Sequence, residues 1–346
     1  MLGTLRFTLA WIVAAGHLER TIWNGTYAVF SFYIISGYLM CLVMNQRYGF
    51  TRKGLRFYLA NRFLRIYPPY WFACLASVGV LALLDADAVR ASDPAWTWPS
   101  SAWGWISNLS FVGLIPLEVN PLVPPAWTLR VEIFYYIAIA LVLGRGRRMA
   151  LAWFGVGVAY HVIVYFYVVD DNPLIPWAAR YFTIGAASLP FSLGALVYHY
   201  RDSIVALIRR PIPVGAVVFT LWVANYLYVA QTESGFLKLG FYLNCAISAV
   251  LLAVLISLPQ MPSRFRRMDS WLGDLSYPIY LMHMQVGAVT AALLGLANWV
   301  PYLFVASAPL LMLISWGMTV GIDRPIETLR DRVKRSLEGG RSPRAG

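Results

Sequence analysis

Two ionisable residues lie within the apolar N-terminal stretch LRFTLAWIVAAGHLER. Eleven steps along an α-helix return to within roughly 20° of the starting direction and rise about 16 Å, so a helix here places Arg6 and His17 on one stripe. Arginine binds anions, and histidine can act as a base near neutral pH. The small residues between them, Ala10, Val13 and Ala14, predict a groove for a long, thin ligand with an anionic head. In the competing interpretation, Arg6 reaches the membrane surface and a neighbouring helix satisfies His17.

The composition is that of an integral membrane protein. Of the 346 residues, 59% are hydrophobic and only 13% are charged. The apolar residues form long blocks, which predict an all-α polytopic fold with about ten transmembrane helices. The predicted spans are 3–18, 27–44, 66–84, 127–143, 149–169, 180–199, 212–230, 236–258, 272–296 and 302–321. The first is interpreted as a retained span, because no cleavage site of a signal peptide follows it.

The arginines and lysines predict the topology. With the N-terminus inside, the connectors assigned to the cytoplasm are 45–65, 144–148, 200–211, 259–271 and the tail after 322. Together they hold 22 of the 28 arginines and lysines. This is the positive-inside pattern, and it places both termini in the cytoplasm. The net charge of +12 therefore reflects topology, and no nucleic-acid partner is expected.

Two connectors have features of their own. Residues 45–65 mix cations with aromatic and aliphatic residues, which predicts an amphipathic helix on the inner membrane face. Residues 85–126, rich in Trp and Pro, form a long outer loop that is expected to dip into the membrane or cover an outer cavity. The predicted organisation is a transmembrane domain over 1–325 and a cytoplasmic C-terminal tail over 326–346.

Five stretches in order resemble the acyltransferase 3 family, bacterial membrane-bound O-acyltransferases of cell-surface sugars. They are LRFTLAWIVAAGHL with Arg6 and His17, FSFYIISGYLM at 30–40, NRFLRIYPPYW at 61–71, PAWTLRVEIFYY at 125–136 and LGDLSYPIYLMH at 272–283. The ending GIDRP at 321–325 is also similar to that of the family. Each stretch alone is weak, but their order on a ten-span topology makes the likeness specific.

The resemblance implies a function. The donor is expected to be an acyl-CoA, usually acetyl-CoA, used from the cytoplasmic side of the bacterial inner membrane. The acceptor is expected to be a sugar hydroxyl of a surface polysaccharide, a lipid-linked precursor or a glycoside. The resemblance also implies a stand-alone transferase, without the soluble esterase-like domain that many relatives carry at the C-terminus.

His17 is the candidate catalytic base. A sugar hydroxyl is a poor nucleophile at neutral pH, and a histidine at the outer end of the first span could take its proton. The arm of the acyl-CoA would run from Arg6 along the small-residue stripe to His17. Direct transfer is the favoured mechanism, and an acyl-histidine intermediate is left open.

Glu132 is the second candidate catalytic residue. A carboxylate inside a span needs a partner. It could orient the imidazole of His17, as carboxylates orient other catalytic histidines. It could equally form a structural ion pair with Arg130 or with an arginine of another helix.

The remaining candidates bind ligands. Arg62 and Arg65, one helical turn apart, suit the phosphates of acyl-CoA, although the positive-inside rule alone explains their position. Trp127, Arg130 and Tyr135 are expected near the acceptor, where the aromatic rings could stack on a sugar; a membrane-interface position explains Trp127 equally well.

The position of His283 in the resemblance implies a supporting hydrogen bond that shapes the cavity at the acceptor. The three cysteines lack a paired spacing, and no metal-ligand cluster or P-loop occurs, so no metal is expected. The expected partners are acyl-CoA, a carbohydrate or lipid-linked acceptor and the bilayer, and a homo-oligomer is left open. The alternative function is a transporter or flippase of a glycan or lipid-linked sugar, although the sequence lacks the internal repeats typical of that class.

Overall fold

The computed structural model describes residues 1–19, 22–115, 119–170, 172, 174–232, 239–296 and 300–330. It is 84% helical, and the described residues contain no strand, which confirms the predicted all-α polytopic fold. The elements are α1 (Leu2–Leu18), α2 (Ile22–Val43), η1 (Met44–Tyr48), α3 (Arg52–Leu83), α4 (Ala86–Ser92), α5 (Ala102–Ser110), η2 (Pro124–Ala126), α6 (Trp127–Ala138), η3 (Ile139–Leu143), α7 (Arg147–Tyr167), α8 (Leu174–Tyr181), α9 (Ile184–His199), α10 (Arg201–Leu207), α11 (Pro211–Thr232), α12 (Leu239–Ser257), α13 (Ser263–Leu294), α14 (Pro301–Met318) and η4 (Thr319–Asp323).

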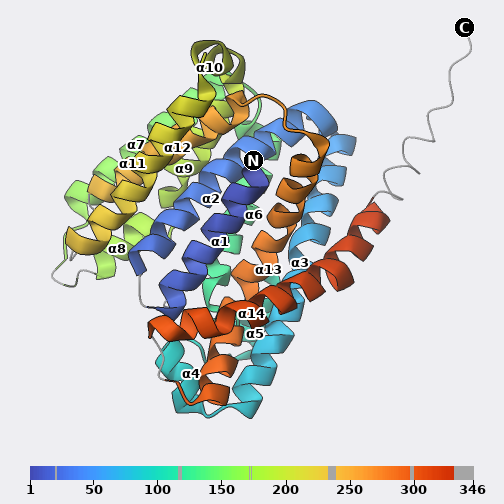
Figure 1. Ribbon diagram of the computed structural model, residues 1–346, viewed down its shortest axis with the longest axis vertical. Coiled ribbons are helices and arrows are strands. Elements are labelled where there is room, and N and C mark those ends of the chain that lie inside the picture. Colours follow the sequence, from blue (N-terminus) through green and yellow to red (C-terminus); the bar gives the residue numbers. More distant parts are fainter. Residues whose placement is uncertain are drawn as a thin grey trace, which may run out of the picture.

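Each of the ten predicted spans coincides largely with helix. Eight helical segments among the described residues are long and apolar enough to cross a membrane. The other two predicted spans fall on α1, which is only 17 residues long, and on α13, where buried polar residues such as His283 and Gln285 lower the hydropathy. In Figure 1, α7, α11 and α12 lie on one side of the bundle and α3 on the other, while α14 crosses the lower part of the bundle. The connector helix α10 lies at one end and α4 at the opposite end, as the topology requires.

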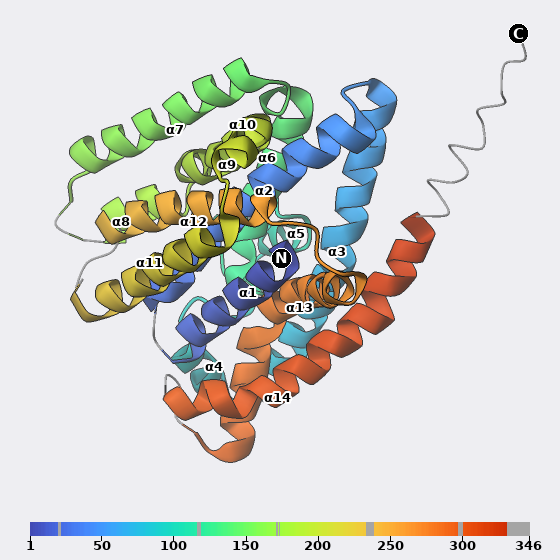
Figure 2. The ribbon, with the colours of Figure 1, turned by 45° about the horizontal axis from the view of Figure 1, so that its top comes forward.

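Helix α1 is fixed between its neighbours α2 and α13 (Figure 2). At its first turn, Oδ1 of Asp269 in α13 accepts hydrogen bonds from the amide of Thr4 at 2.8 Å and from its hydroxyl at 2.7 Å. The two backbones also touch, since a Cβ on Gly273 would lie 2.9 Å from Cα of Gly3. A Cβ on Gly3 would collide with the carbonyl oxygen of Asp269. The position of α1 is therefore set by both a cap and a close glycine contact.

The small-residue stripe of α1 is part of the core. Ala10, Val13 and Ala14 are each 0% exposed, and they line neither of the two cavities described below. The predicted groove between Arg6 and His17 is therefore wrong. Small residues let α2 and α13 approach closely, and these helices fill the space.

The inner-face segment 52–65 is continuous with the third span. Helix α3 runs for 32 residues and passes through Pro68 and Pro69 without ending. The predicted amphipathic helix is thus the first half of α3 rather than a separate element. This continuity carries Arg62 and Arg65 directly toward the membrane interior.

The long outer loop packs along the second half of α3. The hydroxyl of Tyr70 donates to the carbonyl of Asn108 at 2.6 Å. The side chain of Asn108 in turn donates to the carbonyl of Asn120 at 2.9 Å and accepts from the amide of Leu122 at 2.6 Å. These buried bonds hold the loop in a defined conformation.

The last helix extends beyond the predicted domain boundary. After α14 and η4, helix continues to Arg330, five residues past position 325. Residues 326–330 of the predicted tail therefore belong to the bundle. Residues 331–346 lie outside the described part of the chain.

Candidate functional site

A cavity of about 550 Å³ lies among α1, α2, α3, α6 and α13. It reaches connectors that the topology assigns to the cytoplasm, and we call it the inner cavity. Its described charged lining residues are Arg6, Arg47, Arg62, Arg65, Arg330, Glu132 and Glu327. Five arginines against two glutamates make this a site for an anionic ligand.

A second cavity of about 310 Å³ lies toward the opposite end, and we call it the outer cavity. His17 lines it from the end of α1, and Trp127 lines it from the start of α6. The long outer loop contributes Asp93 and Leu114, and α8 contributes Tyr181. The long loop therefore lines a cavity, in agreement with one of the two expectations for it.

The two cavities share one wall. Val29, Thr128 and Tyr280 line both of them. Oγ1 of Thr128 lies 2.6 Å from the hydroxyl of Tyr280, and both hydroxyls lie within 3.0 Å of the carbonyl oxygen of Pro125. Two hydroxyl protons are thus available for three short oxygen–oxygen contacts. The side chains of Thr128 and Tyr280 stand between the arginines of the inner cavity and His17.

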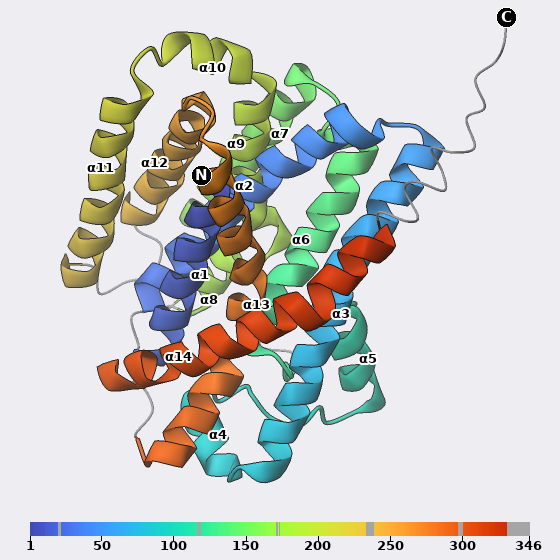
Figure 3. The same cartoon turned by 45° about the vertical axis from the view of Figure 1, so that its right-hand side comes forward.

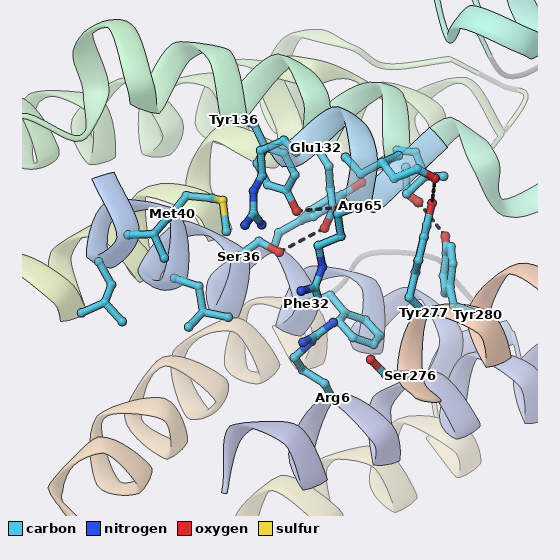
Figure 4. A pocket seen from close by; sticks show the side chains of 18 of the residues that line it. Arg6, Phe32, Ser36, Met40, Arg65, Glu132, Tyr136, Ser276, Tyr277 and Tyr280 are labelled. Atoms are coloured by element: carbon cyan, nitrogen blue, oxygen red, sulfur yellow. Dashed lines mark hydrogen bonds between the residues drawn. The ribbon is translucent and has the colours of Figure 1, made fainter. Parts of the chain in front are cut away.

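The inner cavity holds Arg6 and Arg65 beside a carboxylate. In Figure 4 the guanidinium end of Arg65 lies between Glu132 and Arg6, close enough for the three charges to interact. Glu132 accepts hydrogen bonds from Ser36 and Tyr136, each at 3.0 Å. The structure therefore brings together three predicted residues, Arg6, Arg65 and Glu132. It does not place Glu132 with His17, which lines the other cavity.

His17 contacts a second histidine. Nδ1 of His283 lies 2.8 Å from the carbonyl oxygen of Tyr280, which can only accept, so we assign the proton of the neutral His283 ring to Nδ1. Its Nε2 is then an acceptor, 3.3 Å from Nδ1 of His17. The carbonyl oxygen of Val13 also faces Nδ1 of His17, at 3.0 Å. Two acceptors at one nitrogen favour the proton there, which leaves Nε2 of His17 as the basic nitrogen.

Asp93 is the acidic residue among the described lining of the outer cavity. Its Oδ1 accepts from the amide of Ala95 at 2.8 Å. Burial raises the pKa of Asp93 above its usual range, while the Ala95 amide and the nearby imidazole of His17 oppose this rise. Asp93 is therefore close enough to His17 to interact with a positive charge on its ring.

Three predicted acceptor residues lie outside both cavities. Tyr135 stacks on Phe191 at 4.5 Å between ring centroids and donates its hydroxyl to the carbonyl of Ile184 at 2.6 Å. Arg130 donates a hydrogen bond to the backbone carbonyl of Phe182 at 3.3 Å. His283 is fully buried behind His17. Among the predicted acceptor residues, only Trp127 lines the outer cavity.

Several residues of the site were not singled out from the sequence. Ser36, Thr128 and Tyr280 lie within the stretches that carry the family resemblance, so their position there was an available signal. Asp93 and Arg330 lie outside those stretches. Their positions in a predicted loop and a predicted tail gave no signal that they line a cavity. In the described part of the chain, no group of His, Cys, Asp and Glu is arranged to hold a metal ion.

Arginines and a histidine on opposite sides of one wall, within a bundle of apolar helices, define a multi-pass membrane protein with two facing ligand cavities. The family model of acyltransferase 3, described as an acyltransferase domain, matches residues 3–320. The chain therefore belongs to the acyltransferase 3 family and is a membrane acyltransferase, which confirms the resemblance. No curated protein and no solved structure matches the chain.

Proposed function

We propose that the protein transfers an acyl group, most simply acetyl, from acyl-CoA in the inner cavity to a sugar hydroxyl in the outer cavity. The observation that carries this proposal is the shared wall, because it brings ligands from opposite membrane faces to the two sides of the Thr128 and Tyr280 side chains, whose displacement lets them meet. The sugar belongs to a surface polysaccharide, a lipid-linked precursor or a glycoside. The membrane is the bacterial inner membrane, with the donor entering from the cytoplasm.

The donor fits the charge of the inner cavity. Arginine binds phosphate through paired hydrogen bonds, and Arg62 and Arg65 project from the same face of α3 into this cavity. Arg6 lies deeper, beside Glu132. The nucleotide end of CoA would contact Arg62 first, and its arm would extend past Arg6 toward Tyr280 and Thr128. This path replaces the one along the stripe of α1.

His17 acts as the general base in this mechanism. Its Nε2 takes the proton of the acceptor hydroxyl while the hydroxyl oxygen forms a bond to the thioester carbonyl carbon. The carbon–sulfur bond then breaks, and the CoA thiolate receives the proton back from the imidazolium. The carboxylate of Asp93 stabilises the transient positive ring, whereas the role considered for Glu132 from the sequence was to orient the imidazole. Direct transfer needs no acyl-histidine.

The acceptor fits the aromatic lining of the outer cavity. Trp127 packs edge-on against Tyr181 at 4.9 Å and Phe182 at 4.6 Å between ring centroids. Aromatic rings bind the apolar faces of sugars, and the volume of about 310 Å³ is at the small end of ligand sites. We infer that one terminal sugar unit enters, while the rest of the acceptor stays outside.

A transfer assay in proteoliposomes tests the function. Radiolabelled acetyl-CoA is supplied with a panel of glycosides and lipid-linked sugars to wild type, His17→Gln and His161→Gln. His161 is a matched control, because it is a buried histidine bonded to the carbonyl of Ala186 and lines neither cavity. We expect labelled product from wild type and His161→Gln, and a loss of about 10²- to 10⁴-fold in His17→Gln. Movement of a sugar across the bilayer without labelling would instead support the transporter alternative.

A further inference from the structure

The C-terminal helix contributes charge to the inner cavity. Glu327 and Arg330, three residues apart on one helical face, line it together with Arg62 and Arg65 of α3. Figure 3 shows this last helical segment running to the inner half of α3. Two elements far apart in sequence thus form the cytoplasmic end of the donor cavity.

The arginines at this end of the cavity outnumber the carboxylates that line it with them. Arg330 lies close enough to Arg62 and Arg65 for their charges to repel one another. Nε of Arg62 and Nε of Arg330 are buried and have no hydrogen-bond partner. Among the described residues, no ion pair joins any of these three arginines to a carboxylate. Buried donors of like charge are costly unless an anion completes the site.

We propose that Arg330 is a donor-binding residue, which together with Arg62 holds a phosphate at the nucleotide end of CoA. Phosphate offers several oxygens to converging guanidinium groups. Glu327 opposes this binding, because its carboxylate lines the same space. The inference rests on the proposed function, since it takes CoA as the ligand of the inner cavity.

Because Glu327 and Arg330 carry opposite charges, neutralising each of them should change the affinity for CoA in opposite directions. The affinity of the full-length protein in detergent for CoA is measured by calorimetry for wild type, Arg330→Gln and Glu327→Gln. We expect Arg330→Gln to weaken binding by about tenfold, as for loss of a charge-assisted contact. We expect Glu327→Gln to tighten it by roughly twofold to fivefold, as for removal of a partly exposed like charge. Misfolding cannot mimic both results, because it only weakens binding.

Arg324→Gln is the matched control. Arg324 lies on the same helical segment, is exposed and does not line the cavity, so this variant should bind CoA as wild type does. Repeating the titrations with dephospho-CoA locates the contact. If Arg330→Gln no longer weakens the binding of dephospho-CoA, the ribose 3′-phosphate is the partner of Arg330. If the substitution still weakens binding, the partner is the pyrophosphate.

The outcomes separate this inference from the proposed function. If wild type binds no CoA, the proposed function fails and the role of Arg330 fails with it. If wild type binds CoA but Arg330→Gln binds it equally well, only the role of Arg330 is overturned. An equal loss in Arg324→Gln would also overturn it, because the effect would then be the total charge of the helix.

Discussion

Replacing His283 by Phe tests how the base is oriented. Phe keeps the bulk of the ring but removes the Nε2 acceptor that lies 3.3 Å from Nδ1 of His17. The carbonyl of Val13 remains as the other acceptor, at 3.0 Å. The substitution therefore removes one of the hydrogen bonds that orient His17, a net loss of about 0.5–1.5 kcal/mol, in addition to the bond from His283 to the carbonyl of Tyr280. At 1.36 kcal/mol per factor of ten, kcat should fall by roughly twofold to twelvefold.

The pattern of kinetic constants separates orientation from direct participation. KM for acyl-CoA should stay unchanged in His283→Phe, because the arginines line the other cavity. Steady-state transfer rates are measured beside His17→Gln and beside His161→Phe, which should retain wild-type kcat. A loss in His283→Phe as deep as that in His17→Gln would mean that His283 itself moves the proton. The assignment of the basic nitrogen to His17 would then be refuted.

Three further predictions concern the carboxylate, the wall and the packing of α1. Asp93→Asn should lower kcat roughly fivefold at neutral pH, for about 1 kcal/mol of charge stabilisation. Because burial raises the pKa of Asp93, the ratio of wild-type to Asp93→Asn rates should approach one as pH falls through that pKa, and a pH-independent ratio would contradict the role. Tyr280→Ala should join the cavities and raise acceptor-independent hydrolysis of acetyl-CoA, measured as free thiol; hydrolysis at the wild-type rate would contradict the closed wall. Gly3→Ala should lower stability by about 1–3 kcal/mol in thermal unfolding, whereas Gly79→Ala, with nothing within 4 Å of its added Cβ, should not; equal effects would exclude the close contact as the cause.

Periodicity and charge were sufficient to predict the helices. The blocks of apolar residues, and the arginines in the connectors between them, follow from the low polarity of the bilayer, which acts on each segment separately. Arg6 and His17 could likewise be placed on one stripe of one helix, because their spacing is a property of a single segment. The family stretches also contain most of the residues that line the inner cavity, but only a minority of those that line the outer cavity.

Relations between helices were not predictable in this way. A contact between Glu132 and His17 was one of two possibilities that the sequence left open, the other being an ion pair of Glu132 with an arginine. The structure places them at different cavities, since α6 presents Glu132 to Ser36 and Tyr136. Similarly, the small side chain of Ala14 could equally have lined a groove or a helix contact. Choosing between these requires the position of the neighbouring helix, which spacing within one segment does not contain.

Arg6 and His17 share one uninterrupted helix, and its first turn is anchored to α13 through Asp269. The separation between Arg6, past which the proposed donor arm extends, and the proposed base His17 is therefore a fixed number of helical turns. Adding a single residue between them would swing the imidazole by about 100° and lengthen the rod by about 1.5 Å. If the proposed roles hold, the cavity walls can change with the ligands, whereas a one-residue insertion or deletion between Arg6 and His17 should abolish transfer.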